Sequence, residues 1–162
     1  MANLRDRVNK PVVTKRTATE RRKDAHYNST GKPDAFSRMI EERMQELGWN
    51  RATLAKLLTT LQPSARVPYE KSSDERTISA SFVTRILQGR RSVPMGDVLA
   101  WANALHLGSA TRIHAFAVIV ALANALRDLR RKLPAHNSAR RKLEPMLDQT
   151  LTKHAKSFTW SG

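Results

Sequence analysis

The sequence contains no cysteine among its 162 residues. This absence excludes disulfide bonds, thiolate zinc sites and a cysteine nucleophile, and it is consistent with a reducing cytoplasm. Long apolar stretches are missing as well, because the longest uninterrupted one covers residues 115–123, far short of a membrane span. The N-terminus has no apolar core of the signal-peptide type. We therefore expect a soluble, intracellular protein.

The residue patterns of common catalytic sites are also missing. Glu41, Glu42 and Glu46 share a predicted solvated helix face, and no partner acid is placed for catalysis. The six glycines are scattered and form no phosphate-binding loop. The sequence therefore predicts a protein that is not an enzyme and that uses no metal and no cofactor. The five histidines form no HExxH pair and stand beside no second ligand: His26, His106, His114, His136 and His154.

Acidic residues are few relative to basic ones. The chain carries 29 Lys+Arg against 14 Asp+Glu, a net charge of +15. Such an excess favours a polyanionic partner, because each neutralised phosphate releases condensed counterions. A cationic protein that is merely soluble, or an RNA binder, would share this charge. The net charges of residues 1–34, 35–109 and 110–162 are +5, +3 and +7, so most of the excess lies outside the middle segment.

Residues 1–34 form a predicted basic, flexible arm. They combine basic residues with threonine, asparagine and two prolines and contain few large apolar groups. Such a segment buries too little surface to offset the entropy of ordering it. The arm could wrap DNA or enter a minor groove, or it could add only non-specific attraction. Arg21, Arg22 and Lys23 are its candidate DNA contacts.

Two helices are predicted early in the middle segment. Asp34 is a suitable N-cap for a helix over residues 35–47, and Gly48 closes that helix. Asn50 caps a second helix over residues 51–59. The pattern then breaks in residues 59–77, which contain two prolines and mixed charges, and a long loop is expected there.

The next helix, over residues 80–88, is the most informative element. Ser79 is its predicted cap and Gly89 its stop. One face is apolar, whereas the other carries small polar groups and one long cation. A short helix with these two faces can pack on a core and present its polar side to a DNA major groove. The apolar face consists of Val83, Ile86 and Leu87, and the polar face of Ser81, Thr84 and Arg85.

Three more helices are expected after residue 90. One begins near Pro94, with Val98, Leu99, Trp101, Ala102 and Leu105 as its apolar face, and ends near Gly108. The next begins at Ser109 or Thr111 and runs to about Leu133. Its first half is apolar almost all round, so burial on more than one side is expected, and residues 127–132 are basic. The last covers about residues 145–156, with a stripe of Leu143, Leu147, Leu151 and Phe158.

Three motifs in this order resemble the helix-turn-helix family of Cro and the lambda-like repressors, also called XRE-type. They are the segments LGWNRATLA at 47–55, ISASFVTRILQGRR at 78–91 and LAWANAL at 99–105, with Val93-Pro94 before the last. The resemblance implies an all-α protein: a five-helix lambda-repressor-like domain over 35–109, a basic arm over 1–34 and a helical extension over 110–162. The family joins its second and third helices by a short turn, whereas this chain has an insertion at 59–77.

The resemblance also implies DNA-contacting roles by position. Ala80, Ser81 and Arg85 would contact base edges, and Phe82 a thymine methyl group. Arg51, Ser79, Thr84, Arg90 and Arg91 would lie at phosphates. Ser79 could act only as a cap, Arg85 could pair with an acid such as Glu46 or Glu75, and Arg90 and Arg91 could simply be solvated. Further accessory contacts are proposed for Lys71, Arg130, Arg131, Arg140 and Arg141.

These features predict a sequence-specific DNA-binding transcriptional regulator, a repressor of bacterial or phage type associated with the nucleoid. Its partner would be double-stranded DNA, with no small-molecule substrate. The protein would act as a homodimer, for which residues 113–126 could supply the interface. Alternatively, a monomer could use its basic C-terminal segment as a second DNA contact. An antitoxin-like or adaptor interaction module and a general RNA or nucleoid binder remain as rival functions.

Overall fold

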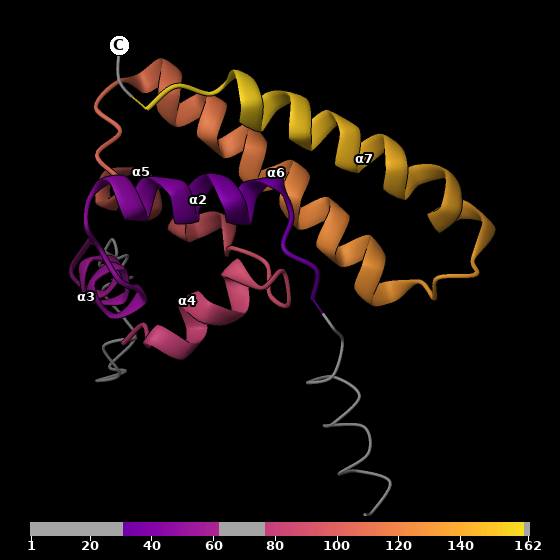
Figure 1. Cartoon of the computed structure of the whole chain (residues 1–162), viewed down its shortest axis with the longest axis horizontal. Coiled ribbons are helices and arrows are strands. Elements are labelled where there is room, and N and C mark those ends of the chain that lie inside the picture. The colour runs from indigo at the N-terminus through magenta and orange to yellow at the C-terminus, as the bar shows by residue number, and fades with distance from the viewer. Residues whose placement is uncertain (1–30, 62–76, 161–162) are drawn as a thin grey trace, which may run out of the picture. The chain divides into compact units, whose positions relative to one another are not determined.

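The computed structural model describes residues 31–61 and 77–160 of the chain. The contacts divide the chain into residues 1–30 and residues 31–162, and only the second unit contains described residues. The described part is all-helical, as predicted (Figure 1). Its elements are α2 (Ala35–Glu46), α3 (Arg51–Leu61), α4 (Ala80–Leu87), the 3₁₀ turn η1 (Met95–Asp97), α5 (Val98–Ala104), α6 (Ala110–Lys132) and α7 (Ser138–Ser157).

The helix starts follow the predicted N-caps. The Asp34 carboxylate accepts a hydrogen bond from the Ser37 amide at 2.9 Å, and the Asn50 side chain accepts one from the Thr53 amide at 2.9 Å. The Ser79 hydroxyl likewise accepts from the amide of Phe82 at 3.2 Å. These bonds satisfy amides that have no partner within the first turn of a helix.

Aromatic side chains join the helices in one core. The ring centroids of Trp101 and Phe116 lie 6.4 and 6.0 Å from that of Phe36, and all three side chains are fully buried. Trp101 is therefore a core residue, as predicted. Trp49 is half-buried, and its ring lies 5.3 Å from that of His106.

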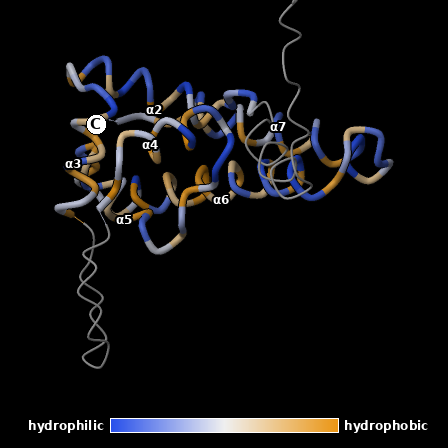
Figure 2. Tube along the Cα trace, turned by 90° about the horizontal axis from the view of Figure 1, so that it is seen from below, coloured by the Kyte–Doolittle hydropathy of each residue, from blue (hydrophilic) through white to orange (hydrophobic). Residues whose placement is uncertain are grey.

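Helices α6 and α7 form an antiparallel pair (Figure 1). Both pack on α2, and the rings of Phe158 and Trp160, just beyond α7, lie 6.3 and 6.2 Å from that of Phe116. Residues 110–162, which the sequence separates as an extension, thus share one compact unit with residues 31–109. In Figure 2 much of α5 and of the first half of α6 is orange, which marks their apolar residues.

The prediction for α5 is wrong in two details. Residues 95–97 form a 3₁₀ turn first, and the chain leaves the helix at His106, which has a positive φ of 65°, rather than at Gly108. Leu99 is 53% exposed, although it was predicted in the apolar face. Successive residues are about 100° apart around a helix, so Leu99 lies on a different side of α5 from the buried Val98 and Trp101.

Burial of α6 on more than one side is also wrong. In the first half of α6, the side chains of Ala115 and Ala121 are exposed. In the basic second half, Arg127 is only 4% exposed. By length and composition alone, α6 is long and apolar enough to cross a membrane, although its apolar residues form no uninterrupted run of that length. The same composition suits a core helix, and one side of α6 packs on α2, α5 and α7.

Helix α7 begins at Ser138, seven residues before the predicted start at Pro145. The Asn137 side chain accepts a hydrogen bond from the Arg140 amide at 3.1 Å and so provides the cap. Pro145 lies inside the helix. Leu143 was predicted on the buried stripe but is 46% exposed, because each step of four residues rotates by about 40° and carries it away from the buried Leu151.

Candidate nucleic-acid interface

Helix α4 is anchored by its apolar face. Val83, Ile86 and Leu87 are at most 1% exposed and belong to the core. Helical geometry places Ser81 and Arg85 on the opposite side, where Ser81 is exposed and Arg85 half-buried. Ala80 and Phe82, also half-buried, lie at the two margins of this side. The four predicted base-contacting residues are therefore presented by one short helix whose other face is fixed.

Two predicted phosphate contacts meet at the start of α3. The Arg51 guanidinium donates to the Thr84 hydroxyl at 3.3 Å and to the Glu41 carboxylate at 3.0 Å. Arg51 thus joins α2, α3 and α4. Because both charged side chains are about two-fifths exposed, the ion pair contributes little to stability.

A second pair of predicted residues connects the segment after α4 with the first turn of that helix. The Arg91 guanidinium lies over the Phe82 ring, 4.6 Å from its centroid. This is the geometry of a cation–π contact, which orients a long arginine side chain without neutralising it. Arg91 is exposed, so its charge remains accessible beside the helix.

Two glycines, Gly31 and Gly89, allow the backbone at Lys32 to lie close to the end of α4. Gly89 has φ +71°, and a Cβ atom on it would lie 2.5 Å from the Lys32 carbonyl oxygen. A Cβ atom on Gly31 would lie 2.3 Å from the Gln88 carbonyl oxygen. The backbone of residues 31–32 therefore crosses that of residues 88–90 in close contact. Lys32, Arg90 and Arg91 are all exposed and belong to the backbone segments that meet just after the C-terminal end of α4, and we call these three residues the cationic cluster.

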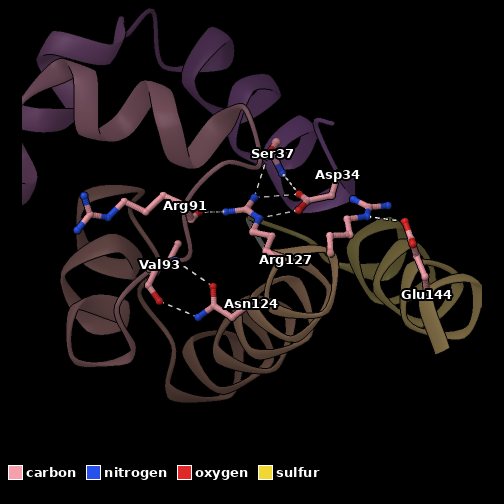
Figure 3. Close-up of polar contacts among 8 residues, drawn as sticks. Asp34, Ser37, Arg91, Val93, Asn124, Arg127 and Glu144 are labelled. Carbon is pink, nitrogen blue, oxygen red and sulfur yellow. Dashed lines mark hydrogen bonds and ion pairs between the residues drawn. The ribbon is translucent and has the colours of Figure 1, made fainter. Parts of the chain in front are cut away.

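Helix α6 holds the backbone that follows α4 (Figure 3). The Asn124 side chain accepts a hydrogen bond from the Val93 amide at 2.9 Å and donates one to the Val93 carbonyl at 2.7 Å. The Arg127 guanidinium donates to the Arg91 carbonyl at 2.7 Å. We name residues 91–93 the post-α4 loop.

Arg127 is also half of a buried ion pair. Its guanidinium donates to both carboxylate oxygens of Asp34, at 2.8 and 3.1 Å, and to the Ser37 hydroxyl at 3.0 Å. The side chains of Arg127 and Asp34 are 3% and 0% exposed. Sequence reasoning counted Arg127 among the basic C-terminal residues that could contact DNA, which its burial contradicts, and it assigned no role to Asn124. A signal was present, since Arg127 follows the buried Phe116, Val120 and Ala123 at helical spacing.

The accessory cations of α6 and α7 divide into two kinds. Arg130 and Arg140 both donate to the Glu144 carboxylate at 2.7 Å, and Arg140 also donates to the Leu133 carbonyl at 2.7 Å, so both link the two helices. Arg131 pairs with Asp128, and Arg141 is exposed. The accessory candidates Arg21, Arg22, Lys23 and Lys71 lie outside the described residues.

Glu144 is the charged centre of this link. Burial raises the pKa of its carboxyl group, but the hydrogen bonds from Arg140 and Arg130 and their positive charges outweigh that effect. The pKa therefore lies below its ordinary value of 4.5, and the carboxylate stays ionised at neutral pH.

Within residues 31–61 and 77–160, no three His, Asp or Glu side chains are grouped closely enough to hold a metal ion. In comparisons with models of known protein families, with curated proteins and with solved structures, no match to this chain was found.

Proposed function

We propose that the protein is a sequence-specific DNA-binding transcriptional regulator whose helix α4 enters the major groove. The observation that carries this proposal is the two-sided character of α4: a fully buried apolar face, an accessible side with Ser81 and Arg85, and exposed arginines directly after the helix. An arginine on such a helix can donate two hydrogen bonds to guanine O6 and N7. Ser81 can bond to several bases, and Phe82 can contact a thymine methyl group.

The positive charges near α4 support a phosphate-contacting role. The cationic cluster lies near one end of the helix, and Arg51 with Thr84 lies along another side. Phosphate contacts of this kind orient a protein on the duplex, while base contacts provide its specificity. The net charge of +15 would add long-range attraction to DNA.

The order of helices supports a helix-turn-helix arrangement over α2 to α6. Helices α3 and α4 contact each other, and the Thr59 hydroxyl accepts a hydrogen bond from the Ile78 amide at 2.9 Å. This bond brings the two ends of the insertion together. We propose that the insertion leaves α3 and α4 packed as in the lambda-repressor-like family, whose members join these helices by a short turn.

Selection from random duplexes tests the proposed function. The full chain should enrich one sequence pattern, and the enriched duplex should bind about 10³-fold or more tightly than a scrambled duplex at the same salt concentration. Enrichment of no pattern, together with a steep salt dependence on every duplex or RNA, would instead identify a general nucleic-acid binder.

Duplex recognition by one short helix favours a homodimer. Two copies would bind a palindrome with half-sites about one helical turn apart. The uncharged side of α6, with exposed Ala115, Ala121 and Ala125, supports an interface between two positively charged copies. A monomer would instead need a second DNA contact, for which exposed Arg141 is a candidate. The mass of the complex in solution distinguishes one copy from two on the enriched duplex.

An interaction module is the second candidate, because α7 exposes large apolar side chains. Leu143 is 46% and Met146 is 62% exposed. A protein partner could cover them, as in an antitoxin-like or adaptor protein. In that case the duplex selection would give little sequence preference, and the double variant Leu143→Ser/Met146→Ser would lose the protein partner while keeping its affinity for DNA.

A further inference from the structure

The buried pair of Arg127 and Asp34 has no evident advantage for stability alone. Both side chains are at most 3% exposed, so each charge has lost its hydration. Replacing a buried ion pair by apolar residues of similar volume is often neutral or stabilising, whereas removing one partner leaves an unpaired buried charge. The contacts of the pair, however, reach beyond Asp34.

The contacts of the pair lead to the post-α4 loop. Arg127 uses three donors on Asp34 and Ser37 and directs a further N–H to the Arg91 carbonyl at 2.7 Å. Figure 3 shows this guanidinium between Asp34 and Ser37 on one side and the Arg91 backbone on the other. The Arg91 side chain points away from Arg127 in the same view. Its guanidinium lies over the Phe82 ring.

Asn124, about one turn before Arg127 on α6, hydrogen-bonds to the same loop. Its two hydrogen bonds to Val93, at 2.9 and 2.7 Å, satisfy the amide and the carbonyl of a residue that is 1% exposed. Together, α6 makes three hydrogen bonds to the backbone of residues 91–93. Hydrogen bonds to backbone groups fix the path of a loop whatever the side chains on it.

We propose that Asn124 and Arg127 are positioning residues that hold the post-α4 loop so that Arg90 and Arg91 contact DNA phosphates in fixed register with α4. This inference rests on the proposed function and adds α6 to the DNA-binding unit. Neither positioning residue touches DNA. Arg127 acts through the Arg91 carbonyl, with its charge neutralised by Asp34, and Asn124 acts through Val93.

The main test is the double variant Asp34→Asn/Arg127→Met in the full chain. Asparagine keeps a cap oxygen for the Ser37 amide, and the double change leaves no unpaired buried charge, so the thermal midpoint should stay within a few degrees of the parent. Because the Arg91 carbonyl loses its donor, affinity for the enriched duplex should fall about tenfold, and the salt dependence should weaken by about one phosphate contact.

A second variant, Asn124→Leu, should give the same weakening at a similar thermal midpoint. Arg43→Met is the matched control, because the Arg43 guanidinium also bonds to a carboxylate, that of Glu46, and to a backbone carbonyl, but this carbonyl belongs to Leu105 instead of the loop. The control should keep both the affinity and the salt dependence of the parent. Parental DNA binding by the folded double variant or by Asn124→Leu would overturn the inference.

Hydrogen exchange on the unaltered protein covers the case in which both variants fail to fold. The Val93 amide donates to Asn124, whereas no hydrogen bond is found for the Arg91 amide in the described part of the chain. The Val93 amide should therefore exchange much more slowly than the Arg91 amide if α6 holds the loop, and equally rapid exchange of the two would overturn the inference. Failure of the proposed function is distinguishable, since the unaltered protein would then show no preference between the enriched and scrambled duplexes.

Discussion

Gly48 and Gly89 each follow a helix in the left-handed region, with φ values of +68° and +71°. Their surroundings differ. A Cβ atom on Gly48 would meet nothing within 4 Å, whereas one on Gly89 would lie 2.5 Å from the Lys32 carbonyl oxygen. Gly48 is needed only for its backbone conformation. Gly89 is needed also for the close crossing that brings Lys32 beside Arg90.

Substitution by alanine should separate these two effects. Gly48→Ala should lower the free energy of unfolding by about 1–2 kcal/mol, the cost of a left-handed non-glycine residue. Gly89→Ala carries the same cost plus steric overlap with backbone, which adds about 1–3 kcal/mol. Urea denaturation of the two variants gives the difference. Equal losses would contradict the close crossing of residues 31–32 and 88–90.

At the scale of elements, the antiparallel pair of α6 and α7 is joined through Glu144. Its carboxylate accepts from Arg130 on α6 and from Arg140 on α7, both at 2.7 Å. The pKa of Glu144 lies below 4.5 in the folded protein, so the folded state binds its proton less readily than the unfolded chain does. A lowered folded pKa stabilises the protein above the unfolded pKa, and this contribution disappears as the pH falls through the folded pKa.

Glu144→Gln should therefore show a pH-dependent loss of stability. At neutral pH the variant should be less stable by about 1 kcal/mol, a typical value for lost hydrogen bonds to a half-buried charged group. The difference should start to shrink as the pH drops below 4.5 and vanish below the folded pKa. Thermal midpoints of the two proteins between pH 3 and pH 7 provide the measurement. A pH-independent difference would show that the ionised carboxylate is not what joins the helices.

The insertion between α3 and α4 should contribute little to the stability of the fold. Its ends are joined by the bond from the Ile78 amide to Thr59, and closing a flexible loop costs only slightly more as the loop lengthens. Replacing residues 62–76 by a short Gly-Ser linker should therefore change the free energy of unfolding by less than about 1 kcal/mol. A larger loss on urea denaturation would contradict a passive role in the fold, and DNA affinity of the same variant would show whether the insertion contacts the duplex.

Local chemistry explains which elements the sequence predicted well. The caps at Asp34, Asn50 and Ser79 each depend on a side chain bonding to an amide a few residues away, so the helix starts were confirmed. The predicted start of α7 at Pro145 was wrong, because the prediction relied on the rule that proline favours the first turn of a helix. The helix starts earlier, where Asn137 caps it by accepting from the Arg140 amide.

Tertiary contacts explain what the sequence did not predict. Arg127 lies on a buried helical face, but its partner Asp34 is 93 residues away in the chain, and no local pattern connects the two. Leu99 and Leu143 have the composition of core residues, yet no other helix of the described part covers them. Nor could the crossing of Gly31 and Gly89 be predicted, because it depends on where two distant segments meet.

At the scale of the whole molecule, a net charge of +15 and the placement of α4 lead to different expectations about DNA. Net charge attracts any duplex, and this attraction weakens steeply with salt. A positioned helix distinguishes sequences, and its base contacts are largely retained at higher salt. The two contributions can be separated by changing one side chain of each kind and comparing two duplexes.

The most direct measurement is the affinity of Arg85→Ala and Arg90→Ala for an enriched and a scrambled duplex, each at several salt concentrations. Arg38→Ala, which changes an exposed side chain of α2, is the control. We predict that Arg85→Ala weakens binding to the enriched duplex by about 1–3 kcal/mol and barely affects the scrambled one. Arg90→Ala should weaken both alike and reduce the salt slope by about one phosphate. Equal losses on both duplexes for Arg85→Ala, with its thermal midpoint unchanged, would contradict a base-contacting role for α4.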